Sequence, residues 1–187
     1  AVRPPVVSWG RAAPGEEPLL RTHLGACLDL CHAAVAHEDP VRSLARLAAA
    51  GVPVAKVQVS AAVHVPAPAD DADRARLAPF VEPRWLHQVG AADGVILPDL
   101  PAALADPGHA ASGPWRVHFH VPLHRAEVGG LPTTRDEVAR FLAHVRTLAA
   151  PPLLELETYT WSVVPGAAPD LAGNVAAEIR WVDAQLA

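Results

Sequence analysis

Short apolar runs alternate with amphipathic segments along much of the chain, and this pattern predicts its strands and helices. Residues 26–31 (ACLDLC) form a nearly wholly apolar run with a single charge, as expected of a strand buried on both faces. A helix is predicted to follow, because Asp39 can cap its first turn, apolar residues recur on one face and Gly51 ends it. Residues 52–60 then provide a second strand, which completes a β–α–β unit.

The alternation resumes in the C-terminal third, after an irregular middle. Residues 61–114 are rich in Pro, Ala and Asp and are interpreted as a long loop with short helices at 72–80 and 99–105. Two further strands are predicted at residues 115–123 and 152–161, each followed by a helix. Strands that alternate with helices in this way predict a parallel sheet covered by helices, either open or part of a barrel. The last helix is expected to bury one face, formed by Leu171, Val175, Ile179, Val182 and Leu186.

The composition is typical of one soluble globular domain that spans residues 1–187. The chain is 51% hydrophobic and carries a formal net charge of −5. Its basic residues are scattered, which argues against nucleic acid or an anionic membrane as a partner. No apolar run approaches the ~18 residues that cross a bilayer, and the N-terminus lacks a signal-peptide pattern. A cytoplasmic protein without direct membrane insertion is therefore expected.

The chain has two cysteines, Cys27 and Cys31. If both lie in the first strand, their Cα atoms are about 13 Å apart, beyond the roughly 7 Å limit for a disulfide. The same spacing within a strand chelates a metal poorly, which disfavours zinc bound by two thiolates. Both cysteines are therefore interpreted as small apolar residues that fill the interior.

Polar residues gather at the C-terminal ends of all four predicted strands, where sites lie in parallel α/β folds. Alternation along a strand places each i, i+2 pair on one face. Carboxylates and imidazoles that converge at such an edge are suited to bind a divalent cation. The residues at the four ends are Asp29 with His32, Gln58 with Ser60, His118 with His120, and Glu155 with Glu157.

Structural roles stay open for each of these residues. Asp29 in an apolar strand is costly unless it is paired or bound to a metal, and His32 can equally satisfy a hydrogen bond at the strand end. His118 and His120 can be buried structural residues, since the chain holds 10 histidines. One of the two glutamates can pair with an arginine, and Lys56 can be a surface residue.

Several of these strand ends also resemble a known family. The motifs are CLDLCH (27–32), KVQVS (56–60), WRVHFHVP (115–122) and LELETYTW (154–161). Together they resemble metabolite traffic proteins of the EboE type and, more broadly, the xylose-isomerase-like TIM barrels that include sugar phosphate isomerases and epimerases. The resemblance implies a (β/α)8 TIM barrel, of which this chain supplies about the last four βα units. Four such strands leave two exposed edges, so a longer polypeptide or a second half is expected to complete the barrel.

The resemblance also implies a metal site. In that superfamily an aspartate, a histidine and two glutamates hold a divalent metal, often Mn, Mg or Zn, and a glutamate removes a proton to form an enediolate. Carried over, Asp29 is a metal ligand and His32 contacts the substrate. Glu155 or Glu157 is the terminal metal ligand and the catalytic carboxylate.

One position departs from the family pattern. Gln58 stands where a histidine ligand is expected, and a neutral amide is a poor donor for a transition metal. His118 or His120 is therefore expected to replace the missing ligand, while the first glutamate would lie in a preceding half of the barrel. Further substrate contacts are assigned to Gln58, Lys56 and Trp161.

Three functions follow as hypotheses. The first is a metabolite traffic protein that handles a small polar metabolite destined for export, alongside a UbiA-type prenyltransferase. The second is a metal-dependent isomerase or epimerase of a sugar or cyclitol that acts through an enediolate. The third is a metabolite-binding barrel without chemistry, which the glutamine at position 58 favours. Whether the protein is an enzyme is left open by the sequence.

Overall fold

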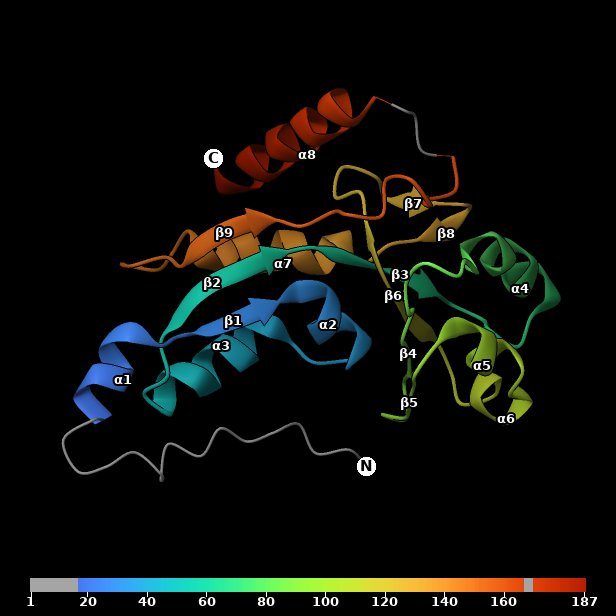
Figure 1. Ribbon diagram of the computed structural model, residues 1–187, viewed down its shortest axis with the longest axis horizontal. Coiled ribbons are helices and arrows are strands. Elements are labelled where there is room, and N and C mark those ends of the chain that lie inside the picture. The colour runs from blue at the N-terminus through green and yellow to red at the C-terminus, as the bar shows by residue number, and fades with distance from the viewer. Residues whose placement is uncertain (1–16, 167–169) are drawn as a thin grey trace.

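Figure 1 shows the computed structural model, which describes residues 17–166 and 170–187. The chain forms a three-stranded parallel sheet, a four-stranded antiparallel sheet and a two-stranded hairpin, with helices around them. The N-terminal segment interpreted as lacking a signal peptide lies outside the described residues. Within the two described ranges, no helix combines the length and the hydrophobicity needed to cross a membrane.

The parallel sheet consists of β1 (Ala26–Asp29), β2 (Val54–Val59) and β9 (Leu153–Leu156), in the order β1–β2–β9. Helix α3 (Pro40–Ala49) lies between β1 and β2 in the chain and begins where Asp39 caps its first turn, as predicted. The β–α–β unit expected near the N-terminus is therefore confirmed. Strands β1 and β9 form the two edges of this sheet.

The register of the sheet aligns three polar residues in one row. Asp29 pairs with Gln58, and Gln58 pairs with Glu155. The alternation along β2 buries Val57 and Val59 in the core and leaves Gln58 on the opposite, more exposed face. The polar row therefore lies on the side of the sheet away from the core.

The antiparallel sheet contains β3 (Ala61–Val65), β6 (Trp115–Val121), β4 (Val89–Ala91) and β5 (Ile96–Leu97), in the order β3–β6–β4–β5. A single residue, Ser60, separates β2 from β3. The two sheets are therefore joined by a nearly continuous run of extended chain, visible in Figure 1 as a strand that passes from one sheet into the other.

Short helices and a hairpin complete the fold. Aspartates begin several of the helices, because a carboxylate accepts hydrogen bonds from the free backbone amides of a first turn. The remaining elements are α1 (Glu17–His23), α2 (Leu30–Val35), α4 (Asp71–Leu77), η2 (Ala78–Phe80), α5 (Leu100–Leu104), α6 (Pro107–Ala110), β7 (Glu127–Val128), β8 (Leu131–Pro132), α7 (Arg135–Val145) and α8 (Leu171–Leu186).

Helix α2 packs where the two sheets meet, and a glycine permits its close approach to β4. A Cβ atom at Gly90 would lie 1.8 Å from the carbonyl oxygen of Val35, so no other residue fits without a shift of the backbone. This contact fixes the C-terminal end of α2, while its N-terminal end follows directly from Asp29.

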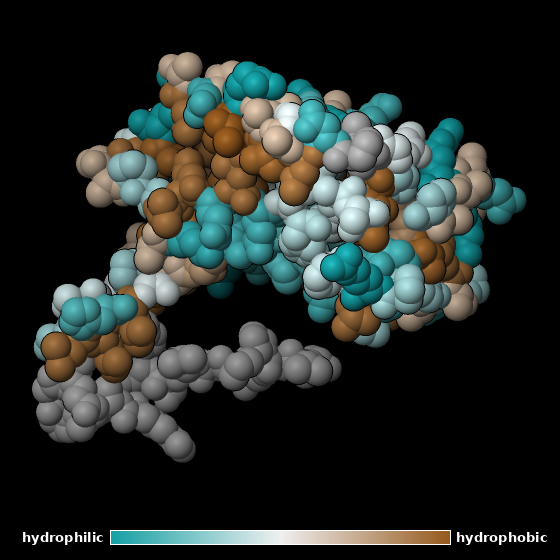
Figure 2. All heavy atoms as spheres, turned by 45° about the horizontal axis from the view of Figure 1, so that its top comes forward, coloured by the Kyte–Doolittle hydropathy of each residue, from teal (hydrophilic) through white to brown (hydrophobic). Residues whose placement is uncertain are grey.

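The packing of α8 differs from the predicted apolar face. Leu171, Val175 and Ile179 are exposed, and Figure 2 shows apolar side chains gathered at the upper left, where α8 comes forward. Val182 is buried as predicted, but Glu178 on the same helix is also buried. The Glu178 carboxylate accepts two hydrogen bonds, which compensates for its removal from water.

The barrel prediction is wrong for the described part of the chain. The predicted third strand forms as β6, but it pairs antiparallel with β3 and β4 in a second sheet. Residues 61–65, predicted as loop, form β3. Because one residue joins β2 to β3, no helical crossover can bring the chain back as a parallel neighbour. Among the described residues the fold is thus a three-stranded parallel sheet beside antiparallel sheets, with no closed barrel.

Candidate metal site

Asp29 ends β1 and caps the first turn of α2. Its Oδ1 accepts hydrogen bonds from the backbone N–H groups of Cys31 (2.8 Å) and His32 (3.1 Å) and from Ser60 Oγ (2.9 Å). These three bonds explain how a carboxylate is accommodated at the end of an apolar run. They are made by Oδ1, and Oδ2 faces a different set of groups.

Two imidazole nitrogens approach Asp29 Oδ2. His32 Nε2 lies 3.8 Å from it and His120 Nε2 lies 3.6 Å from it. Neighbouring ligand atoms around a tetrahedral ion, with bonds of about 2.0 Å, are roughly 3.3 Å apart. Asp29, His32 and His120, called the outer set here, therefore stand close to the spacing of a metal-binding triad. His32 is the exposed member and His120 the buried one.

The hydrogen bonding of His120 leaves one nitrogen available. Nδ1 lies 2.7 Å from the carbonyl oxygen of Glu157, which can only accept, so Nδ1 carries the proton. Nε2 is buried and has no hydrogen-bond partner among the described residues. Burial lowers the pKa of His120, although the nearby Asp29 carboxylate acts in the opposite direction. The ring is therefore a neutral imidazole with a free lone pair, the form that binds metals.

His118 lies two residues before His120 on β6. Its ring centroid is 4.8 Å from that of His120 and 4.4 Å from that of His32. Burial, reinforced by the two neighbouring imidazoles, lowers the pKa of His118 to about 3. Its Nε2 is also buried without a hydrogen-bond partner in the described part of the chain. His118 and His120 thus both lie beside His32, and His120 also lies beside Asp29.

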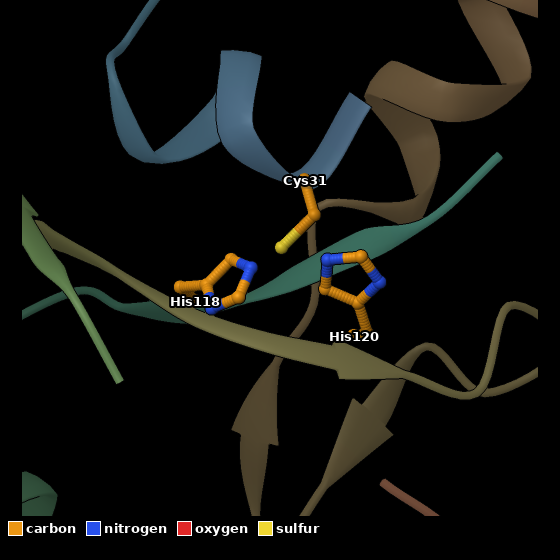
Figure 3. Close-up of side chains that lie close together, drawn as sticks. All are labelled: Cys31, His118 and His120. Carbon is orange, nitrogen blue, oxygen red and sulfur yellow. The ribbon is translucent and has the colours of Figure 1, made fainter. Parts of the chain in front are cut away.

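Cys31 joins this cluster from the first turn of α2. Its sulfur and one nitrogen each of His118 and His120 lie within 4.8 Å of one another, and these three residues are called the inner set here. Figure 3 shows the thiol between the two imidazole rings. Burial, followed by the Asp29 charge, raises the pKa of the thiol.

The interpretation of Cys31 as a strand residue is wrong. Strand β1 ends at Asp29, so Cys31 lies in a helix while Cys27 is exposed on the strand. The two cysteines therefore do not lie in the same strand. The argument that their spacing along a strand disfavours metal chelation no longer applies to Cys31.

Glu157 lies directly after β9 and contributes both its backbone and its side chain. Its Oε2 is 4.0 Å from His120 Nδ1 and is buried without a hydrogen-bond partner among the described residues. Burial, together with the negative charges of Asp29 and Glu155, raises the pKa of the Glu157 carboxyl. The group is thus suited to take up and release a proton next to the outer set.

Other predicted site residues lie apart from the outer and inner sets. Glu155 forms an exposed ion pair with Lys56 of the neighbouring strand, so it neutralises that cation. Trp161 stacks on His124, with ring centroids 6.4 Å apart. Glu155, Lys56 and Trp161 belong to neither group of potential metal ligands found among the described residues.

A cavity of about 470 Å³ adjoins the outer set. Gln58 lines it, and this residue lies in the same sheet row as Asp29. The other lining residues are Cys27, Leu28, Asp29, His32, Ala33, Ala36 and Glu38.

Two aromatic residues near the site were not predicted. The Tyr159 ring lies 4.7 Å from the His120 ring, and Trp85 lies 5.1 Å from Tyr159. Tyr159 belongs to the LELETYTW motif, but no local pattern indicates that it meets Trp85. Their contact depends on two loops that are far apart in the chain.

Comparisons of the chain with protein families, with curated proteins and with solved structures found no match.

Proposed function

We propose that this protein binds a divalent transition-metal ion through the outer set and handles a small polar metabolite beside it. The observation that carries the proposal is the approach of His32 Nε2 and His120 Nε2 to Asp29 Oδ2, at 3.8 and 3.6 Å. One carboxylate oxygen and two imidazole nitrogens are ligands that Mn²⁺, Zn²⁺ and related ions accept. A bound ion would polarise an oxygen atom of the metabolite.

The adjoining cavity supports a small ligand. Its volume of about 470 Å³ falls within the range of small-molecule sites, and Gln58 offers a neutral amide for hydrogen bonds. The resemblance of the CLDLCH and LELETYTW segments to EboE-type proteins supports a role in metabolite traffic. The proposal accordingly includes a cytoplasmic location and a UbiA-type prenyltransferase as a functional partner.

A metal-dependent isomerase or epimerase of a sugar or cyclitol is a second candidate, favoured by Glu157. A carboxyl with a raised pKa, 4.0 Å from His120 Nδ1, can remove a proton from a carbon atom and return it. Such a transfer needs a substrate that reaches both groups, because Glu157 approaches His120 at Nδ1 while Asp29 Oδ2 approaches it at Nε2.

Metal binding tests the first proposal directly. Chelator-treated protein is titrated with Zn²⁺, Mn²⁺ and Mg²⁺ by isothermal calorimetry, and a single class of site is expected for the first two ions. His32→Ala should weaken binding more than about 10-fold, because a ligand is lost. His23→Ala is the matched control, since His23 is exposed on α1. Equal Mn²⁺ affinity in the two variants would rule out the outer set, and no binding of any of the ions would favour the non-catalytic hypothesis.

Solvent exchange tests the second candidate. Metal-loaded protein is incubated with candidate ketoses and cyclitol ketones in D₂O, and deuterium next to the carbonyl is measured by NMR. Exchange that disappears in Glu157→Gln, while metal affinity persists, supports the isomerase. Equal exchange in the variant and the wild type would remove Glu157 from the reaction.

A further inference from the structure

The inner set of Cys31, His118 and His120 is chemically distinct from the outer set. All three residues are buried, whereas the outer set includes the largely exposed His32. Figure 3 shows the Cys31 sulfur directed into the space between the two rings, which project from β6. The sulfur and two ring nitrogens lie within 4.8 Å of one another, so only a modest adjustment would bring all three onto one ion.

Two buried nitrogens in this group have no hydrogen-bond partner among the described residues. They are His118 Nε2 and His120 Nε2, and the residues that bear them are 9% and 2% exposed. A buried polar atom without a partner costs on the order of 1–3 kcal/mol, so two such atoms at one point call for an explanation. A metal ion that accepts both lone pairs would provide it.

We propose that Cys31, His118 and His120 form a site for a thiophilic ion of the zinc class. Zn²⁺ binds cysteine and histidine together, whereas Mg²⁺ and Mn²⁺ prefer oxygen ligands. On binding, the metal–sulfur bond replaces the S–H bond, and the thiol proton passes to solvent.

The inner and outer sets compete for the same nitrogen. His120 Nδ1 donates to the Glu157 carbonyl, so Nε2 is the atom that both sets require. An ion on the inner set therefore withdraws His120 from the outer set. Asp29 Oδ2, a member of the outer set, lies 3.6 Å from this nitrogen and is also placed to serve as a fourth ligand of an ion on the inner set. The inner site does not depend on the proposed function, because it requires neither His32 nor the metabolite cavity.

Cobalt substitution tests the inner site. Chelator-treated full-length protein is titrated with Co²⁺, whose thiolate complexes absorb in the near ultraviolet by sulfur-to-metal charge transfer. The wild type is expected to show this band and to lose it on addition of Zn²⁺. Cys31→Ser should abolish the band and weaken Co²⁺ affinity more than about 100-fold, since a direct ligand is lost. Cys27→Ser is the matched control, because Cys27 is exposed, and it should keep the band.

The variants separate this proposal from the outer set. If Co²⁺ binds without the band and Asp29→Asn abolishes binding, the inner site is refuted and the outer set stands. If the band is present and survives His32→Ala, the inner site is supported independently of the outer set. A band that persists in Cys31→Ser but disappears in Cys27→Ser refutes the assignment. If circular dichroism shows that Cys31→Ser does not fold, His118→Gln is measured in its place. An unchanged charge-transfer band in His118→Gln refutes the site.

Discussion

The two carboxylate oxygens of Asp29 have separate roles, and Asp29→Asn distinguishes them. Oδ1 caps α2 and accepts from Ser60, while Oδ2 faces His32 and His120. Asparagine is as good an N-cap as aspartate and retains an oxygen for these bonds, so the unfolding free energy without metal should change by less than about 0.5 kcal/mol. Asp29→Ala removes both the cap and the Ser60 bond and should cost about 2–3 kcal/mol.

The stabilisation that a bound metal ion adds should, in contrast, be largely lost in Asp29→Asn. An ion at 100 times its Kd stabilises the folded state by about 2.7 kcal/mol. If the loss of the Asp29 carboxylate weakens affinity about 100-fold, the same ion concentration equals the Kd of Asp29→Asn and contributes only about 0.4 kcal/mol. The variant should therefore lose about 2.3 kcal/mol of metal-induced stability while its metal-free stability stays near that of the wild type.

Urea unfolding followed by tryptophan fluorescence measures both quantities. The wild type, Asp29→Asn and Asp29→Ala are compared after chelator treatment and again at a fixed excess of Zn²⁺. Equal metal-induced stabilisation in the wild type and Asp29→Asn would refute the role of Oδ2 as a ligand. A metal-free Asp29→Asn as unstable as Asp29→Ala would instead refute the separation of the two oxygens.

Four further variants test the packing and charge of the fold. Burial raises the pKa of Glu178, so the folded state holds the Glu178 proton more firmly than the unfolded chain does. The wild type should therefore lose stability as the pH rises through that raised pKa. The urea midpoint of Glu178→Gln should not decline over the same pH range. Gly90→Ala should destabilise the protein by more than about 2 kcal/mol or prevent folding, because its Cβ atom would lie 1.8 Å from the carbonyl oxygen of Val35. Gly94→Ala should cost only about 1 kcal/mol, because nothing lies within 4 Å of the added Cβ atom and only the positive φ of +87° is unfavourable. Phe141→Ala should cost about 3–5 kcal/mol in the same assay, since Phe141 is fully buried, and a loss below about 1 kcal/mol would contradict its place in the core.

Local signals predicted the elements that are specified by local chemistry. The cap at Asp39, the apolar spacing after it and the glycine that follows are all within one helix length, and α3 forms there. The apolar runs at β1, β2 and β9 likewise form strands, although all three strands are shorter than predicted. The early end of β1 has a local cause as well, because Asp29 caps a helix that begins at the next residue.

Strand pairing was not predictable in the same way. The segment at β3 is rich in Pro and Ala on its C-terminal side and was interpreted as loop, but its partner β6 lies some fifty residues later in the chain. Whether β6 joined the parallel sheet or a second sheet depended on that pairing. The buried face of α8 depended similarly on hydrogen bonds from Leu123 and Thr158 to Glu178, which no helical periodicity indicates.

The sequence by itself indicated candidate metal ligands: Asp29 at a strand end, His32 close behind it and a histidine pair on a later strand. It also indicated Glu155 and Glu157, which belong to neither set, and it did not indicate Cys31. This much is local, since i, i+2 and i, i+3 spacings follow from strand and helix geometry. Only the tertiary structure decided that these residues meet and that Glu155 pairs with Lys56 instead. It also decided that Cys31 lies in a helix, with its sulfur close to the same two histidines. The physical reason is that convergence depends on the pairing of β3 with β6 and on the packing of α2 against them, and both are contacts between distant parts of the chain.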